Sequence, residues 1–207
     1  MDLIDFDKIY QSFITNNKDF EICKNVLDIL NSKDSITYNH CYRVGCMAGN
    51  FSMFLQYPEE YCKKVFNAAI MHDIGKLKIN DNIMRKPGKS LTKEERKILV
   101  AHPLYGVEVL KELNLYLKLD YIVPLIALHH ESPLDGKGLF KIDVKNIADY
   151  IFITKICDCF DAIRVSRRPD ETNKTLEETL NILNHQCYYN LTQEWIDKFN
   201  QYINYIL

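Results

Sequence analysis

Five of the six histidines in this chain of 207 residues fall in one ordered series together with aspartates. The series runs His40, His72-Asp73, His102, His129-His130 and Asp158. Its members lie about 30 residues apart, so each comes from a different helix or helix end, as metal sites in helix-bundle cores require. Neutral imidazoles with a few carboxylates suit borderline transition metals such as Fe, Mn, Zn and Co. The series therefore predicts a metal site inside a helical bundle.

The number of donors favours two metal ions over one. This series holds more donors than a single catalytic metal with open positions can use, whereas two ions can share a bridging carboxylate. Asp73 is the natural bridge because it adjoins His72. Asp158 lies among Ile, Cys and Phe residues, where a buried carboxylate needs a partner or a metal. Asp161 shares its helix face, and we expect it to orient a ligand or the water rather than to bind metal directly.

The remaining histidine and the cysteines are interpreted as structural. His185 stands in an Asn- and Tyr-rich segment without a motif, so we expect an ordinary surface or core residue. The seven cysteines are scattered through apolar helical contexts without CxxC pairs, which predicts reduced core thiols. They are Cys23, Cys41, Cys46, Cys62, Cys157, Cys159 and Cys187.

The elements that must position these residues are predicted to be helices throughout. Apolar residues recur three and four positions apart over long stretches, and alternating strand-like runs are scarce. The expected helices span 5–15, 19–31, 35–56, 59–73, 92–101, 103–113, 118–130, 144–164, 175–188 and 192–206. Thr92 with Glu95 and Thr175 with Glu178 fit capping boxes at two helix starts. Pro124 predicts a kink or a late start within 118–130.

Two irregular stretches, 74–91 and 131–143, directly follow histidine motifs. Proline and glycine punctuate both, with Pro87-Gly88 marking a turn in the first. Connecting segments frequently carry binding and catalytic residues. These two stretches are therefore expected beside the site.

The composition excludes several classes of protein. The 26 Lys and Arg residues against 28 Asp and Glu residues give a formal charge of −2, which argues against a nucleic-acid-coating protein, so no duplex nucleic acid is expected as partner. Hydrophobic residues at 47% and charged residues at 26% match a globular domain. No apolar run approaches the ~18 residues needed to span a membrane, and the acidic start does not resemble a signal peptide. We therefore expect a cytoplasmic protein without a membrane partner.

Together these residues resemble the HD superfamily of metal-dependent phosphohydrolases, and more narrowly its HD-GYP branch. The matching stretches are HDIGKLKIN at 72–80, DNIMRKPGKSLTKEE at 81–95, HPLYG at 102–106, HHESPLDGKG at 129–138 and DCFDA at 158–162. The resemblance covers 35–170. It implies an all-α fold, the HD-domain helical bundle, formed by 35–207 as a single compact unit with the helices of 1–34 packed on it.

The resemblance also implies a role for each residue of the series. One metal would be bound by His40, His72, Asp73 and Asp158. The second would be bound by His102, His129 and His130, with Asp73 bridging. Lys76 of HDIGK resembles the family lysine that contacts substrate phosphate or a metal-bound water. Gly75, Gly106, Gly136 and Gly138 would serve turns and close backbone approaches beside the site, and Gly136 and Gly138 are expected to contact the substrate. The two divalent ions are expected to be Fe or Mn, with Zn, Co or Ni as alternatives.

This chain departs from the family pattern at three places. Gly138-Leu139-Phe140 stands where the branch has Gly-Tyr-Pro. Ile36 occupies the position of a Glu that binds a third metal in some members, so two metals are expected. The family's Arg-Pro-Tyr is displaced, as Arg167-Arg168-Pro169-Asp170. Arg164, Arg167 and Arg168 remain candidate phosphate-binding residues, and a solvated charge run is the alternative.

The leading hypothesis is a phosphodiesterase that hydrolyses a cyclic dinucleotide, which the resemblance implies to be cyclic di-GMP, to the linear dinucleotide or GMP. Two metals roughly 3.5–4 Å apart can hold a bridging hydroxide for an in-line attack on phosphorus. Lys76 would neutralise charge on the non-bridging oxygens. The alternatives are an HD-type phosphohydrolase for another nucleotide or phosphoester, and a degenerate dinucleotide-binding signalling module. A homodimer or a regulatory protein partner is left open, and the Tyr-rich tail at 188–205 is expected to form core packing or a dimer face.

Overall fold

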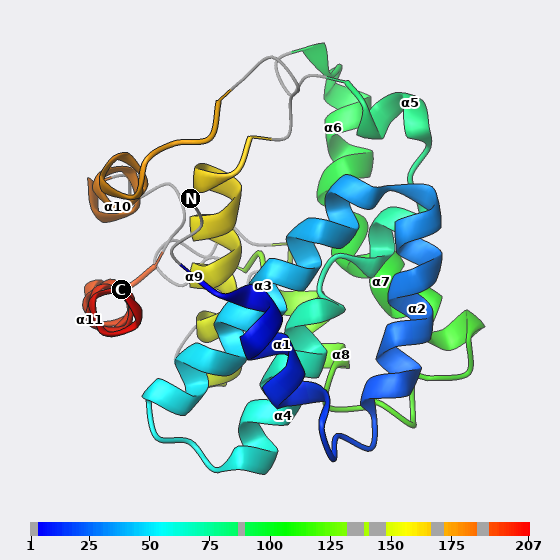
Figure 1. The fold of residues 1–207 in the computed structure, drawn as a ribbon. Helices are drawn as coiled ribbons and strands as arrows, with labels where there is room; N and C mark the ends of the chain where they lie inside the picture. The colour runs from blue at the N-terminus through cyan, green and yellow to red at the C-terminus, as the bar shows by residue number, and fades with distance from the viewer. Residues whose placement is uncertain (1–3, 87–89, 132–138, 141–147, 167–171, 186–190) are drawn as a thin grey trace.

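A computed structural model describes residues 4–86, 90–131, 139–140, 148–166, 172–185 and 191–207. Across these ranges every regular element is a helix, so the predicted all-α fold is confirmed (Figure 1). The elements are α1 (Phe6–Ile14), α2 (Phe20–Lys33), α3 (Ser35–Phe54), α4 (Glu59–Ile70), the 3-10 helix η1 (Ile74–Lys78), α5 (Asp81–Met84), α6 (Lys93–Val100), α7 (His102–Glu112), α8 (Val123–Leu128), α9 (Asp149–Arg164), α10 (Leu176–His185) and α11 (Gln193–Ile206).

Helix α3 connects the two apolar cores of the bundle. It packs against α4, α9, α2 and α1. Cys41 and Cys46 lie in the core shared with α1, α2, α4, α7 and α8. Met47 and Phe51 lie in the core shared with α9, α10 and α11. Because opposite faces of α3 are buried, this helix sets the relative positions of segments from both ends of the chain.

The N-terminal helices pack on the bundle. Phe13 of α1 stacks on Phe66 of α4 with ring centroids 5.1 Å apart, and Phe20 of α2 lies beside the same ring. Phe13 and Phe20 are buried in the core that includes α3. The division of the chain at residue 34 stays a prediction.

The Tyr-rich tail contributes mainly to the core. Trp195, Phe199 and Tyr202 of α11 are buried, and each of their rings contacts Phe51 of α3. Tyr205 is 73% exposed. Tyr188 and Tyr189 lie outside the described residues. Of the two interpretations of the tail, core packing applies to the three buried rings.

Two helices are shorter than the sequence pattern predicted. The stretch expected as one helix over 118–130 is helical only at Val123–Leu128, because Pro124 suits a first turn and cannot continue a helix from residues before it. The late start predicted at this proline is therefore correct. The helix expected over 59–73 ends at Ile70, which leaves His72 and Asp73 in the turn that follows.

The stretch 74–91 is more regular than predicted. It contains η1 and α5, each too short to show an apolar repeat. The predicted start of α6 is confirmed, because Thr92 and Glu95 form a capping box. Thr175 and Glu178 make the same reciprocal pair of hydrogen bonds ahead of α10.

The described part of the chain contains neither a disulfide nor a helix that could span a membrane. Six of the seven cysteines are buried and free, as predicted, and Cys187 lies outside the described residues. None of the helices described is both long and apolar enough to cross a membrane.

Candidate metal centre

The seven predicted metal ligands come together between helices that are far apart in the sequence. They are His40 of α3, His72 and Asp73 of the turn before η1, His102 at the start of α7, His129 and His130 at the end of α8, and Asp158 of α9. All are buried except His130, which is exposed.

His40, His72, Asp73 and Asp158 form the first group. Nε2 of His40 lies 3.0 Å from Oδ1 of Asp158 and 3.8 Å from Oδ2 of Asp73. Nε2 of His72 lies 3.5 Å from Oδ2 of Asp73 and 3.9 Å from Oδ1 of Asp158. Two imidazole nitrogens and two carboxylate oxygens therefore face a common centre.

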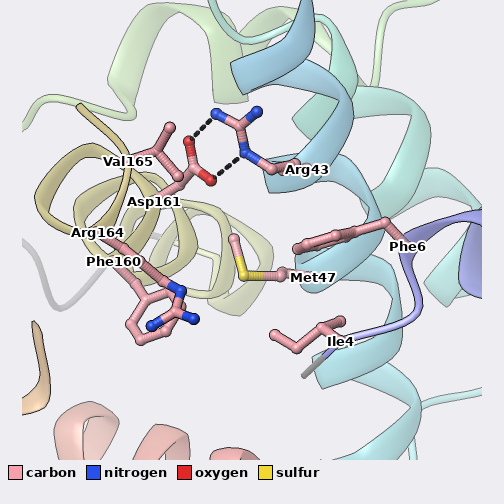
Figure 2. Close-up of a pocket in the computed structure, with 8 residues that line it drawn as sticks. All are labelled: Ile4, Phe6, Arg43, Met47, Phe160, Asp161, Arg164 and Val165. Carbon is pink, nitrogen blue, oxygen red and sulfur yellow. Dashed lines mark hydrogen bonds and ion pairs between the residues drawn. The ribbon is translucent and has the colours of Figure 1, made fainter. Parts of the chain in front are cut away.

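Asp161 contacts the far side of the His40 ring. Its Oδ2 lies 2.7 Å from Nδ1 of His40, and because a carboxylate accepts, this nitrogen donates. Arg43 donates to Asp161 with two nitrogens (Figure 2). Burial raises the pKa of the Asp161 carboxyl, but the hydrogen bonds from His40 and Arg43 outweigh burial and lower it below its usual value. Asp161 thus touches a predicted ligand, as expected, and its role stays a prediction.

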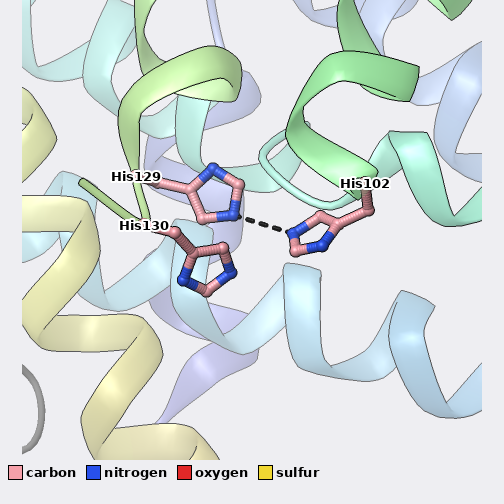
Figure 3. Close-up of side chains that lie close together, drawn as sticks. All are labelled: His102, His129 and His130. Carbon is pink, nitrogen blue, oxygen red and sulfur yellow. Dashed lines mark hydrogen bonds between the residues drawn. The ribbon is translucent and has the colours of Figure 1, made fainter. Parts of the chain in front are cut away.

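His102, His129 and His130 form the second group (Figure 3). Nε2 of His102 lies 3.1 Å from Nε2 of His129. The ring centroid of His130 lies 4.1 Å from that of His129 and 4.9 Å from that of His102. One ring nitrogen from each residue lies within 4.8 Å of the others. Three imidazoles from two helix ends therefore surround one position.

Backbone contacts determine the tautomers of three of these histidines. Nδ1 of His72, His102 and His129 each lies 2.7 to 2.9 Å from the carbonyl oxygen of the residue three positions earlier. A carbonyl only accepts, so each Nδ1 carries a proton. Burial lowers the pKa of His72 and of His129, which favours their neutral forms. In these two rings Nε2 therefore presents a lone pair to the centre.

The donor set fits divalent cations. Nε2 of His72 is buried without a hydrogen-bond partner and faces carboxylate oxygens. The His102 and His129 Nε2 atoms lie 3.1 Å apart, close enough for both to bind one cation at about 2.1 Å. Acceptor atoms that face one another in a buried space repel each other unless a cation lies between them. Each group therefore has the chemistry of a cation site.

Asp73 links the two groups. Its Oδ1 lies 3.0 Å from Nε2 of His102 in the second group, and its Oδ2 faces His40 and His72 in the first. The buried Lys76 donates to the same Oδ2. Burial raises the pKa of the Asp73 carboxyl, but the charge of Lys76, together with the neighbouring His72 and His102 rings, holds it well below its usual value. An ionised carboxylate with one oxygen toward each group has the geometry of a bridge.

Two glycines bring His102 close to Asp73. A Cβ on Gly75 would lie 1.9 Å from the carbonyl oxygen of His102 and 2.5 Å from the amide nitrogen of Gly106. A Cβ on Gly106 would lie 2.4 Å from Cγ2 of Ile126. The backbones of η1 and α7 therefore touch where only glycine fits, which agrees with the close approach expected of these residues.

The predicted substrate-binding residues are described only in part. Arg164 lines a pocket with Phe160, Asp161 and Arg43, and its Nη1 is buried without a hydrogen-bond partner (Figure 2). Gly136, Gly138, Arg167 and Arg168 lie outside the described residues. His185 is exposed on α10, as an ordinary surface residue would be.

Sequence reasoning missed two residues beside the centre. Arg43 lies three positions after His40, and this helical spacing was the available signal that both side chains share a face. Glu131 directly follows His130, is buried, and accepts the amide hydrogen of Phe140 at 2.7 Å. Its charge next to the histidine pair was the corresponding signal. Lys155 of α9 donates to the carbonyl oxygen of Glu131 and so connects this segment to α9.

In this all-α bundle, histidines and aspartates from separate helices form two groups that one carboxylate joins. This arrangement defines a class of helical metalloprotein. The family model described as HD domain matches residues 24–203. The chain belongs to this family.

Curated relatives cover much of the chain. The cyclic di-GMP phosphodiesterase of Thermotoga maritima is 36% identical over 180 residues, which is 83% of this chain and 46% of the relative. The cyclic di-GMP phosphodiesterase response regulator RpfG of Xanthomonas campestris is 33% identical over 72% of this chain and 38% of its own length. The 3'3'-cGAMP-specific phosphodiesterase 2 of Vibrio cholerae is 31% identical over 71% of this chain and 28% of its own length. The resemblance to the HD-GYP branch is thus confirmed, although the chain spans less than half the length of these relatives.

Solved structures confirm the fold. The HD domain of the L. monocytogenes phosphodiesterase PgpH in complex with cyclic-di-AMP aligns with a TM-score of 0.57 at 20% identity, covering 88% of this chain and 97% of that one. Bd1817, a HDG"Y"P protein from Bdellovibrio bacteriovorus, aligns with a TM-score of 0.63 at 15% identity, covering 96% of this chain and 69% of that one. The helical bundle is therefore the HD-domain fold.

Proposed function

We propose that this protein is a metal-dependent phosphodiesterase that hydrolyses a cyclic dinucleotide, with cyclic di-GMP as the preferred substrate. The observation that carries the proposal is Asp73, which presents one carboxylate oxygen to each of two histidine groups. The names of the Thermotoga and Xanthomonas relatives support the substrate. The product is the linear dinucleotide, or GMP after a second cleavage.

The first cation would be bound by His40, His72, Asp73 and Asp158, and the second by His102, His129 and His130, with Asp73 shared. When bound, two such ions lower the pKa of water and stabilise the charge that develops during displacement at phosphorus. Iron or manganese is the preferred pair, and zinc, cobalt or nickel are alternatives, because imidazole and carboxylate ligands suit all of them.

Lys76 supplies positive charge next to the shared carboxylate. Its ammonium group is buried and donates to Oδ2 of Asp73, the oxygen that faces the first group. A phosphodiester bound between the two groups would come within reach of this charge, which would stabilise negative charge on the non-bridging oxygens. Arg164 offers a further guanidinium for phosphate, and Gly136, Gly138, Arg167 and Arg168 remain predictions for substrate contact.

The test combines metal analysis with hydrolysis of cyclic di-GMP by wild type and by Asp73→Ala. We expect the wild type to contain two ions per chain and to hydrolyse the substrate, and the variant to lose metal and activity together. Asp28→Asn is the matched control, because Asp28 makes an exposed ion pair with Lys24 on α2. Full activity in Asp73→Ala would refute the assignment of the site.

Another cyclic dinucleotide is the second candidate substrate. Gly138-Leu139-Phe140 replaces the motif that names the branch, and the Vibrio relative is named for 3'3'-cGAMP. A panel of purified cyclic di-GMP, cyclic di-AMP and 3'3'-cGAMP, with a linear dinucleotide and a phosphomonoester, separates the candidates. No turnover of cyclic di-GMP beside fast turnover of another member would reassign the substrate. Binding of a dinucleotide without any turnover would indicate a signalling module instead.

A further inference from the structure

His40 differs from His72, His102 and His129 in what orients its ring. The Nδ1 atoms of His72, His102 and His129 donate to backbone carbonyls three residues earlier, so the local fold determines their tautomers. His40 instead donates to Asp161, a side chain 121 residues away on α9. The orientation of His40 therefore depends on how α3 and α9 pack and on what holds the Asp161 carboxylate.

Arg43 holds this carboxylate at both oxygens. Its Nε lies 2.6 Å from Oδ1 of Asp161, and its Nη2 lies 2.9 Å from Oδ2 (Figure 2). Oδ2 is also the atom that accepts from His40. Asp161 is buried, so its ionised form depends on these charged hydrogen bonds. Two parallel bonds from a planar guanidinium fix the carboxylate plane, which a single bond would leave free to rotate.

His40, Arg43 and Asp161 form a closed unit across two helices. His40 and Arg43 lie three positions apart on α3, and both meet the same carboxylate from α9. Phe160 of α9 and Met47 of α3 are buried in the same apolar core and line the same pocket as the ion pair. The contact between α3 and α9 therefore determines where Nε2 of His40 points, and it points at Asp158, 3.0 Å away.

We propose that Arg43 is a positioning residue for the first cation group, acting through Asp161 on the tautomer and orientation of His40. The inference rests on the metal centre of the proposed function but not on the identity of its substrate. A carboxylate on the outer nitrogen of a histidine ligand keeps the inner nitrogen unprotonated and basic, and loss of such a partner weakens metal affinity about 10- to 100-fold. In the second group, backbone carbonyls orient His102 and His129, so these two ligands do not depend on Arg43.

The deciding experiment is a cobalt titration of metal-free protein against a competing chelator, followed by the visible absorbance of bound Co²⁺. The variants are Asp161→Asn, Arg43→Gln, Arg43→Lys and the double variant Arg43→Gln/Asp161→Asn. An asparagine at 161 would turn its amide oxygen to Arg43 and donate its amide hydrogen to Nδ1 of His40. His40 would then carry its proton on Nε2, where it cannot bind a metal.

We expect the wild type to bind two Co²⁺ ions. In Asp161→Asn one of the two dissociation constants should rise about 10- to 100-fold, while the other changes less than about twofold. Arg43→Gln should weaken the same ion, and Arg43→Lys should restore part of the affinity because a lysine keeps the charge but not the fork. The double variant should bind no more weakly than Asp161→Asn, since both changes act through His40.

Controls separate positioning from general damage. Arg85→Gln and Asp28→Asn remove exposed charges of the same kinds and should leave both affinities unchanged. Circular dichroism and melting temperature show whether each variant folds, and if Asp161→Asn does not fold, the two Arg43 variants decide. Unchanged affinity for both ions in folded Arg43→Gln overturns the proposal, as does equal weakening of both. Cobalt binding does not depend on turnover. The titration therefore tests the role of Arg43 even if the protein hydrolyses no cyclic dinucleotide.

Discussion

The backbone of Gly75 touches that of His102 so closely that a Cβ on the glycine would stand 1.9 Å from the His102 carbonyl oxygen. Gly75 follows Asp73 by two residues, and His102 begins α7. This contact therefore brings Nε2 of His102 to its position 3.0 Å from Oδ1 of Asp73. One backbone contact thus controls how the two cation groups share a carboxylate.

Gly75→Ala is expected to separate the two groups. The added methyl would meet backbone atoms that cannot rotate away, so η1 and α7 must move apart, at a cost of about 1–3 kcal/mol in the free energy of unfolding. Urea unfolding and metal analysis measure both effects, and we expect a loss of stability together with weaker binding at the second group. Ser32→Ala, an exposed change on α2, is the control. Stability and metal content equal to those of wild type would contradict the close contact.

Lys76→Met tests the charge beside the shared carboxylate. We expect the ions to remain bound while kcat for the dinucleotide falls about 100-fold or more, because a donor is lost that acts mainly on the developing charge. Lys78→Met is a matched control from the same short helix, since Lys78 forms partly exposed ion pairs with Glu108 and Glu112. Steady-state kinetics at saturating metal measure the difference. Equal kcat in the two variants would exclude this role for Lys76.

Metal removal is expected to lower the melting temperature. Ions that bind the folded chain but not the unfolded chain stabilise it by about 2.7 kcal/mol when the free ion is at 100 times its dissociation constant. Thermal melts with increasing Mn²⁺ after chelator treatment should therefore shift upward with concentration. Asp73→Ala should show little shift, because it lacks the shared ligand. A melting temperature independent of metal in the wild type would count against both groups as cation sites.

The metal-free protein is expected to lose stability in mild acid. Burial lowers the pKa of His72 and of His129 below the ordinary value of 6.5. As the pH falls below 6.5, the unfolded chain gains protons on these histidines that the folded chain does not accept, so the free energy of unfolding decreases. Melts of chelator-treated protein from neutral pH down to about pH 5 measure this slope. His72→Asn should flatten the slope, whereas His185→Asn, an exposed change, should leave it unaltered.

Phe199→Ala tests the contribution of the C-terminal helix to the bundle. Phe199 is fully buried against Phe51 and Phe160, so its truncation should cost about 3–5 kcal/mol of unfolding free energy. Tyr205→Ala on the same helix removes a ring that is 73% exposed and should change stability by less than about 1 kcal/mol. Chemical denaturation compares the two. Equal costs would show that α11 is not packed as described.

Much of the local structure could be predicted from sequence, because it depends on residues within a few turns of one another. The apolar repeats indicated most helices, the capping boxes of Thr92 and Thr175 marked two starts, and Pro124 marked a late one. The pattern failed where elements were too short to repeat, as in η1 and α5. It also failed after Ile70, where the chain leaves the helix although Met71 and Ile74 continue the apolar spacing of three and four residues.

The sequence by itself determined which side chains could bind metal and in what order they occur along the chain. Only the tertiary structure decided that His40 meets Asp158 and Asp161, that Asp73 turns one oxygen to His102, and that Arg43 completes the contact with Asp161. The physical reason is the distance along the sequence between the residues that interact. A helical pattern depends on neighbours three or four residues away, whereas these contacts join residues up to 121 positions apart, and their geometry depends on how α3, α7 and α9 pack against each other.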